Sequence, residues 1–235
     1  HDEQTGCCWQ HHAKSFGDDR VMELRRSEIW RYLGYRGKTP GEREQREIER
    51  VALNMQRYIV PRHIYSQKPC VVFADRVQIE GVIFQSRMLA RALAQCEEVL
   101  LLAATLGSEA DQMVRRYQVQ SMADAAIAQA VCAEMLESYL DGICAGIAKQ
   151  QEQQGLFLGA RFSPGYGDLA LESQKEFFAL LDCTRRLGIS LTAGGMMTPT
   201  KSVTAFLGLS RVCRKRQARS CDVCDRRECA FRREK

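Results

Sequence analysis

Apolar residues repeat with the period of a helix in two long stretches of the chain and with the period of a strand near its end. Following Pro40, five of them recur at spacings of three and four, which predicts a helix that buries one stripe. A longer helix is predicted over about 121–150, where the buried face is broader. Over 202–209, alternate apolar residues share one face of a strand. The three apolar sets are Ile48, Val51, Ala52, Met55 and Ile59; Ile127, Val131, Met135, Leu136, Leu140, Ile143 and Ile147; and Val203, Ala205, Leu207 and Leu209.

The rest of the pattern predicts shorter elements. The predicted helices cover 27–33, 86–94 and 172–181, and the predicted strands cover 63–67, 71–79, 99–104, 156–162 and 189–192. Helices and strands alternate irregularly, and the late strands are short. The sequence therefore predicts an α+β fold with a largely antiparallel central sheet and flanking helices.

Polar residues at the predicted helix starts indicate how these helices are capped. We expect Thr39, Ser86 and Ser108 to be N-caps, because Ser and Thr side chains can accept from free N–H groups at a helix start. His63 stands alone in a predicted strand, and a structural role with a satisfied hydrogen bond is the favoured interpretation.

A turn-forming segment, 161–168, follows the predicted strand 156–162. Pro164 restricts its own φ, and Gly165 and Gly167 allow backbone angles that a Cβ atom disfavours. Arg161, just before the turn, carries a planar fork of donors suited to a carboxylate or a phosphate. Alone, this pattern is typical of a plain connecting turn.

Three carboxylates lie three and four residues apart on the long predicted helix: Glu134, Glu137 and Asp141. Such a stripe is typical of a solvated helix face. The alternative is that one carboxylate turns toward a cationic ligand.

Six segments in consistent order resemble the S-adenosylmethionine-binding activation domain of cobalamin-dependent methionine synthase, and more closely its stand-alone form. The resemblance extends over about 28–210 and is carried by 29–37, 103–107, 161–168, 169–175, 187–192 and 197–205. It agrees with the predicted fold class.

The resemblance implies a binding site without a catalytic residue. Arg161 would pair with the methionine carboxylate of S-adenosylmethionine, and Glu137 would lie near its positive groups. The backbone around Phe162, Gly165 and Tyr166 would contact the adenosyl portion.

The resemblance also implies a partner that carries cobalamin, namely a methionine synthase subunit. This subunit would be reactivated from cobalt(II) by reductive remethylation, with an electron from a flavodoxin-like donor. Another corrinoid methyltransferase stays open as the partner.

The basic residues are concentrated at the end of the chain. The net charge is +5, but residues 211–235 carry +6, so the remainder is nearly neutral. Nucleic acid is therefore not expected as a partner, although a module that binds nucleic acid or metal through the tail stays open as a third function.

No apolar run is long enough for a bilayer, and five single cysteines in apolar segments are typical of buried residues in a reducing compartment. We expect a cytoplasmic protein.

The tail contains a Cys-x-x-Cys pair with further cysteines on both sides. Cys213, Cys221, Cys224 and Cys229 could hold zinc or an iron–sulfur cluster. A reduced flexible tail, a redox pair and a basic docking segment stay open as alternatives to metal binding. The predicted organisation is an N-terminal extension (1–24), a ligand-binding domain (25–210) and a basic cysteine-rich tail (211–235).

Overall fold

The computed structural model describes residues 22–35 and 37–212. Its main sheet has six strands in the order β3-β2-β1-β4-β8-β5, and all neighbouring strands are antiparallel. A separate two-stranded ribbon joins β6 and β7. The strands are β1 (Arg62–Val72), β2 (Arg76–Ile79), β3 (Val82–Gln85), β4 (Glu98–Thr105), β5 (Phe157–Leu158), β6 (Ser190–Leu191), β7 (Met197–Thr198) and β8 (Ser202–Ser210).

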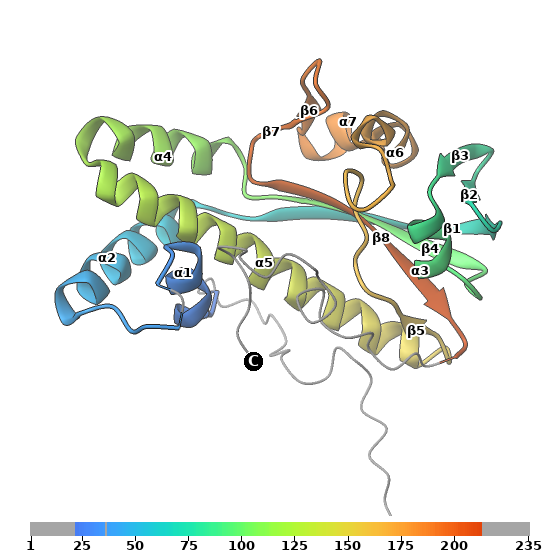
Figure 1. Cartoon of the computed structure of the whole chain (residues 1–235), viewed down its shortest axis with the longest axis horizontal. Helices are drawn as coiled ribbons and strands as arrows, with labels where there is room; N and C mark the ends of the chain where they lie inside the picture. Colours follow the sequence, from blue (N-terminus) through green and yellow to red (C-terminus); the bar gives the residue numbers. More distant parts are fainter. Residues whose placement is uncertain (1–21, 36, 213–235) are drawn as a thin grey trace, which may run out of the picture.

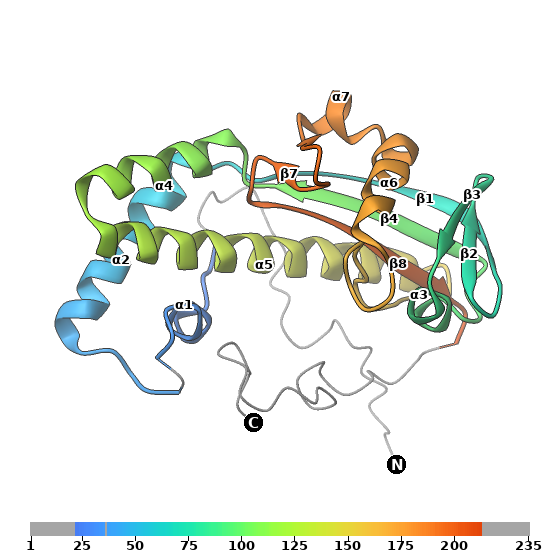
Figure 2. The same ribbon diagram turned by 45° about the horizontal axis from the view of Figure 1, so that its top comes forward.

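Helices cover both faces of this sheet, which makes three layers (Figures 1 and 2). On one face, α5 runs beneath the strands and packs against α1, α2 and α4, while α3, α6 and α7 lie on the opposite face. The helices are α1 (Arg26–Tyr32), α2 (Glu42–Tyr58), α3 (Arg87–Ala92), α4 (Ser108–Gln120), α5 (Met122–Glu152), α6 (Gln174–Leu181) and α7 (Cys183–Leu187), with a short 3-10 helix at Leu171–Ser173. The predicted α+β class is confirmed.

The central strands β4 and β8 separate two apolar cores. Alternate β8 residues Ala205, Leu207 and Leu209 face α5, as the period-two pattern predicts. Phe206 faces the opposite core, where its ring meets Phe84 and Phe177 edge-on at centroid distances of 5.0 and 4.9 Å. Both faces of the central strands are therefore buried.

Several predicted boundaries and caps are wrong. The predicted strand 71–79 is the end of β1 followed by β2, and the predicted strand 156–162 is reduced to the two residues of β5. Gly41 and Gly107, rather than Thr39 and Ser108, occupy the N-cap positions of α2 and α4.

Two of the polar predictions are confirmed. The Ser86 hydroxyl accepts from the Leu89 N–H at 2.9 Å and caps α3. His63 Nδ1 is hydrogen-bonded to the Tyr139 hydroxyl at 2.7 Å, a structural contact between β1 and α5. Within the described part of the chain, no helix is long and apolar enough to cross a bilayer.

Candidate functional site

The segment that carries Arg161 is attached to β8, next to the short edge strand β5. Phe162 and Phe206 exchange two backbone hydrogen bonds of 2.9 and 2.7 Å, and the Ser163 hydroxyl donates to the Thr204 carbonyl at 2.7 Å. From there the chain crosses β8 and continues toward α6 (Figure 1). Because the Gly159 N–H also donates to the Gly208 carbonyl at 2.8 Å, β8 holds the backbone on both sides of Arg161.

The turn itself depends on its two glycines. Gly165 has a φ of +83° and Gly167 a φ of +58°, which are left-handed conformations that favour glycine. The Gly165 N–H donates to the Leu169 carbonyl at 2.9 Å, which closes the turn. A Cβ atom on Gly167 would also collide with the Met88 thioether. The glycine pattern read from the sequence therefore reflects a real backbone requirement.

Asp168 joins the turn to the start of α3. Its carboxylate accepts from the Ser86 hydroxyl and from the N–H groups of Arg87 (2.9 Å) and Met88 (3.2 Å). These bonds, above all the one from Ser86, lower the pKa of Asp168 below its usual value. The stabilisation of the fold by the ionised Asp168 carboxylate is present at neutral pH and is lost as the pH falls through the lowered pKa.

Replacing Ser86 by Ala is expected to destabilise the protein by about 1 kcal/mol, because α3 loses its N-cap and Asp168 loses a donor. Urea unfolding measures the change. Ser86→Thr, which keeps the hydroxyl, is the control. An unchanged unfolding midpoint in Ser86→Ala would contradict the capping role.

Arg161 and Glu137, which the resemblance assigns to one ligand site, lie in direct contact. Arg161 Nη2 donates to Glu137 Oε2 at 2.7 Å, and Nη1 donates to Asp141 Oδ1 at 3.0 Å. The Arg161 side chain is only 20% exposed. Burial disfavours its charge, but the neighbouring carboxylates, Glu137 first, outweigh this effect and raise the pKa of Arg161. The guanidinium therefore stays charged.

The carboxylate stripe of α5 is not a solvated face, which corrects the general expectation for such stripes. Glu134 is fully buried and accepts from Arg25 Nε at 2.7 Å and from the Arg25 backbone N–H at 3.0 Å. Arg25 Nη1 also donates to Asp141 Oδ2 at 2.9 Å. Sequence reasoning missed Arg25 because no local spacing relates it to a helix more than a hundred residues away.

Two aromatic residues follow Arg161 on its turn, and Phe162 packs against the core on the face of the sheet opposite α5. Phe162 and Tyr166 form an edge-on pair with centroids 6.0 Å apart, and Tyr166 is 55% exposed. On α1, burial and then the charge of Glu137 raise the pKa of Tyr32, which indicates that this ring also lies near Glu137. An exposed aromatic ring and an arginine fork therefore share one short turn.

The arrangement suits a ligand that carries charges of both signs. Arg25 and Arg161 contribute two positive charges, while Glu134, Glu137 and Asp141 contribute three negative ones. The cluster therefore has a net charge of −1. A ligand with a carboxylate and two cationic groups would complement it in both sign and distribution.

The cysteines fall into a buried group and a group beyond the described residues. Cys70, Cys96, Cys132, Cys144 and Cys183 are free and buried, as predicted. Burial raises the thiol pKa of Cys132 to about 12 and that of Cys144 to about 11, so these are not reactive thiolates. Among the residues that the structure describes, no group of His, Cys, Asp or Glu could hold a metal ion. The predicted ligands Cys213, Cys221, Cys224 and Cys229 lie outside those residues.

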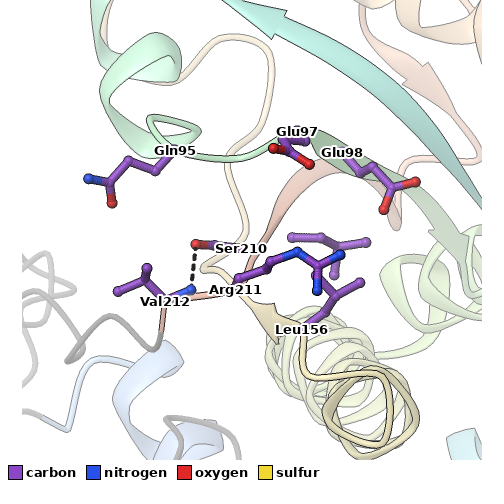
Figure 3. A pocket seen from close by; sticks show the side chains of 8 residues that line it. Gln95, Glu97, Glu98, Leu156, Ser210, Arg211 and Val212 are labelled. Carbon is purple, nitrogen blue, oxygen red and sulfur yellow. Dashed lines mark hydrogen bonds between the residues drawn. The ribbon is translucent and has the colours of Figure 1, made fainter.

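A small hollow of about 110 Å³ lies elsewhere, between the start of β4 and the end of β8 (Figure 3). Glu97, Glu98 and Arg211 line it, and the Val212 N–H donates to the Ser210 hydroxyl at 3.1 Å at its margin. None of the predicted ligand-binding residues lines it.

Comparisons with known proteins agree with this fold. Residues 43–215 match the family described as "Vitamin B12 dependent methionine synthase, activation domain". A solved structure described as the "MetH Reactivation Domain bound to AdoHcy" superposes with a TM-score of 0.59 at 15% identity, covering 82% of this chain and 77% of that one. A comparison with curated protein sequences yields no match. The family match covers most of the chain, and the chain therefore belongs to the activation-domain family of vitamin B12-dependent methionine synthase.

Proposed function

We propose that this protein binds S-adenosylmethionine at the Arg161 turn and serves as the reactivation subunit of a cobalamin-dependent methionine synthase. The observation that carries the proposal is the contact of Arg161 with Glu137 and Asp141 at the start of a turn that exposes Tyr166. Membership of the activation-domain family supports it. The structural relative is described as bound to AdoHcy, the demethylated form of the same ligand.

The residues present fit S-adenosylmethionine group by group. Its carboxylate matches the Arg161 fork, which can bind a carboxylate through two parallel hydrogen bonds. Its ammonium and sulfonium groups match Glu137, whose side chain is 35% exposed and accessible to a ligand. The ring of Tyr166 and the backbone around Phe162 and Gly165 offer an apolar and hydrogen-bonding surface to the adenosyl portion. The ligand's net charge of +1 complements the −1 of the cluster.

The chain's own contribution is binding and orientation rather than acid–base or nucleophilic catalysis. A cobalamin carried by the partner would supply the methyl-accepting chemistry, with the electron from a separate donor, while Arg161 and Glu137 would hold the methyl donor S-adenosylmethionine. Arg161 and Glu137 fix the two ends of the amino-acid group, so that the methyl group is presented in one direction. The turn's attachment to β8 and to α3 keeps this orientation rigid.

We propose further that the cobalamin is carried by a separate cytoplasmic protein and that a flavodoxin-like donor supplies the electron. The protein would then be inactive alone, with 25–210 as the binding unit, 1–24 as an extension and 211–235 as an appended tail. For the tail cysteines, zinc or an iron–sulfur cluster is the proposed ligand. Another corrinoid methyltransferase remains the alternative partner.

The function is tested by mixing the protein with S-adenosylmethionine, a reductant and a methionine synthase subunit inactivated as cobalt(II). We expect the visible spectrum of the cobalt(II) form to be replaced by that of the methylated form, in proportion to the S-adenosylhomocysteine released. Omission of the protein is the control. A spectrum that stays unchanged with several corrinoid proteins would rule out the proposed function.

A further inference from the structure

We infer that Asp141 is a positioning residue of this site, which holds the Arg161 guanidinium in place for the ligand carboxylate. The inference rests on the proposed function and concerns the same ligand. Both Asp141 oxygens are engaged, by Arg161 Nη1 at 3.0 Å and by Arg25 Nη1 at 2.9 Å. These two donors come from segments far apart in the sequence, so the carboxylate is clamped between them.

Arg25 is itself a fixed donor. The fully buried Glu134 accepts from Arg25 Nε at 2.7 Å and from Nη2 at 3.2 Å, and the Ser138 hydroxyl donates to the same carboxylate at 2.7 Å. A row of alternating charges thus runs from the buried Glu134 through Arg25 and Asp141 to Arg161. Its two acidic members, Glu134 and Asp141, lie seven residues apart on α5, which places them along one helix face.

Arg161 requires such support because its backbone lies outside any helix or strand. A free arginine side chain loses rotamer entropy on binding unless it is already ordered. Asp141 orders it through Nη1 without depending on the ligand. We therefore infer that Asp141 contributes to affinity through Arg161 alone, with no contact to the ligand.

The two carboxylates that contact Arg161 then have separate roles. Asp141 is tied through Arg25 to the interior of the protein and keeps its position. Glu137, on the more exposed side, is able to turn toward the positive groups of the ligand while Asp141 retains the guanidinium. Because Asp141 holds the guanidinium in place for a carboxylate, the site should select ligands that have a free carboxylate.

The test compares Asp141→Asn with the unaltered protein by calorimetry, using two ligands. Methylthioadenosine carries the adenosyl portion of S-adenosylmethionine but no amino-acid group. We expect Asp141→Asn to bind S-adenosylmethionine about tenfold more weakly and methylthioadenosine equally well. In an Arg161→Ala background, Asp141→Asn should have no further effect, because the two residues act as one unit. Asp124→Asn is the matched control, because Asp124 also lies on α5 and is paired with an arginine, Arg50 of α2.

Unchanged S-adenosylmethionine affinity in Asp141→Asn overturns the inference while the proposed function stands. An equal loss for both ligands, or additive effects in the double variant, also overturns it, since either indicates a general structural role. If the unaltered protein binds neither ligand, the proposed function itself fails. Should Asp141→Asn not fold, Asp141→Glu decides: the displaced carboxylate should weaken S-adenosylmethionine binding about threefold, and equal affinity overturns the inference.

Discussion

Replacing Arg161 by Ala is expected to weaken S-adenosylmethionine binding about 100-fold, which corresponds to roughly 2.7 kcal/mol. The loss has this size because a charge-assisted, two-bond contact with the ligand carboxylate disappears. The net charge of the site also falls from −1 to −2. Isothermal titration calorimetry measures the affinity, and methylthioadenosine binding should change little.

Two further variants test whether the loss of affinity is specific to the Arg161 guanidinium. Arg161→Lys keeps the charge without the planar fork and should lie between Arg161→Ala and the unaltered protein. Arg50→Ala removes an arginine that is likewise paired with an aspartate of α5, but on the exposed surface, and should leave affinity unchanged. If Arg161→Ala binds the ligand as tightly as Arg50→Ala does, the proposed site is wrong.

Replacing Arg25 by Ala is expected to destabilise the fold by about 3 kcal/mol, because the buried carboxylate of Glu134 loses its charged partner. This value is the low end for a broken buried pair, since the backbone N–H of residue 25 and Ser138 continue to donate to Glu134. For a chain of this length, the midpoint of thermal unfolding should fall by roughly 6 to 12 °C.

The neighbouring residue provides a matched control for this variant. Arg26 is paired with Glu49 on the surface, where both side chains are largely exposed, so Arg26→Ala should change stability by less than about 0.5 kcal/mol. Equal midpoints for Arg25→Ala and Arg26→Ala would show that the Glu134 pair contributes nothing to stability.

Periodic elements of the fold could be predicted because their patterns are local. The predicted helix over 121–150 differs from α5 by a few residues at its ends, and the alternation in β8 correctly identified the face that packs on α5. The errors occur where a distant contact competes with a local rule. Ser108, expected as an N-cap, lies instead within the first turn of α4, where the nearby Asp111 accepts from the Thr200 N–H at 2.9 Å and from its hydroxyl.

At the candidate site, the sequence by itself determined two things. Gly165 and Gly167 identify a turn with left-handed backbone angles, and the spacing of Glu134, Glu137 and Asp141 places three carboxylates along one face of α5. Both follow from backbone geometry within a few residues. Only the tertiary structure decided which of these carboxylates is buried and which arginine each one contacts. Arg25 and Arg161 reach α5 from opposite directions along the chain, and an ion pair across such separations depends on how the layers pack, which no local pattern encodes.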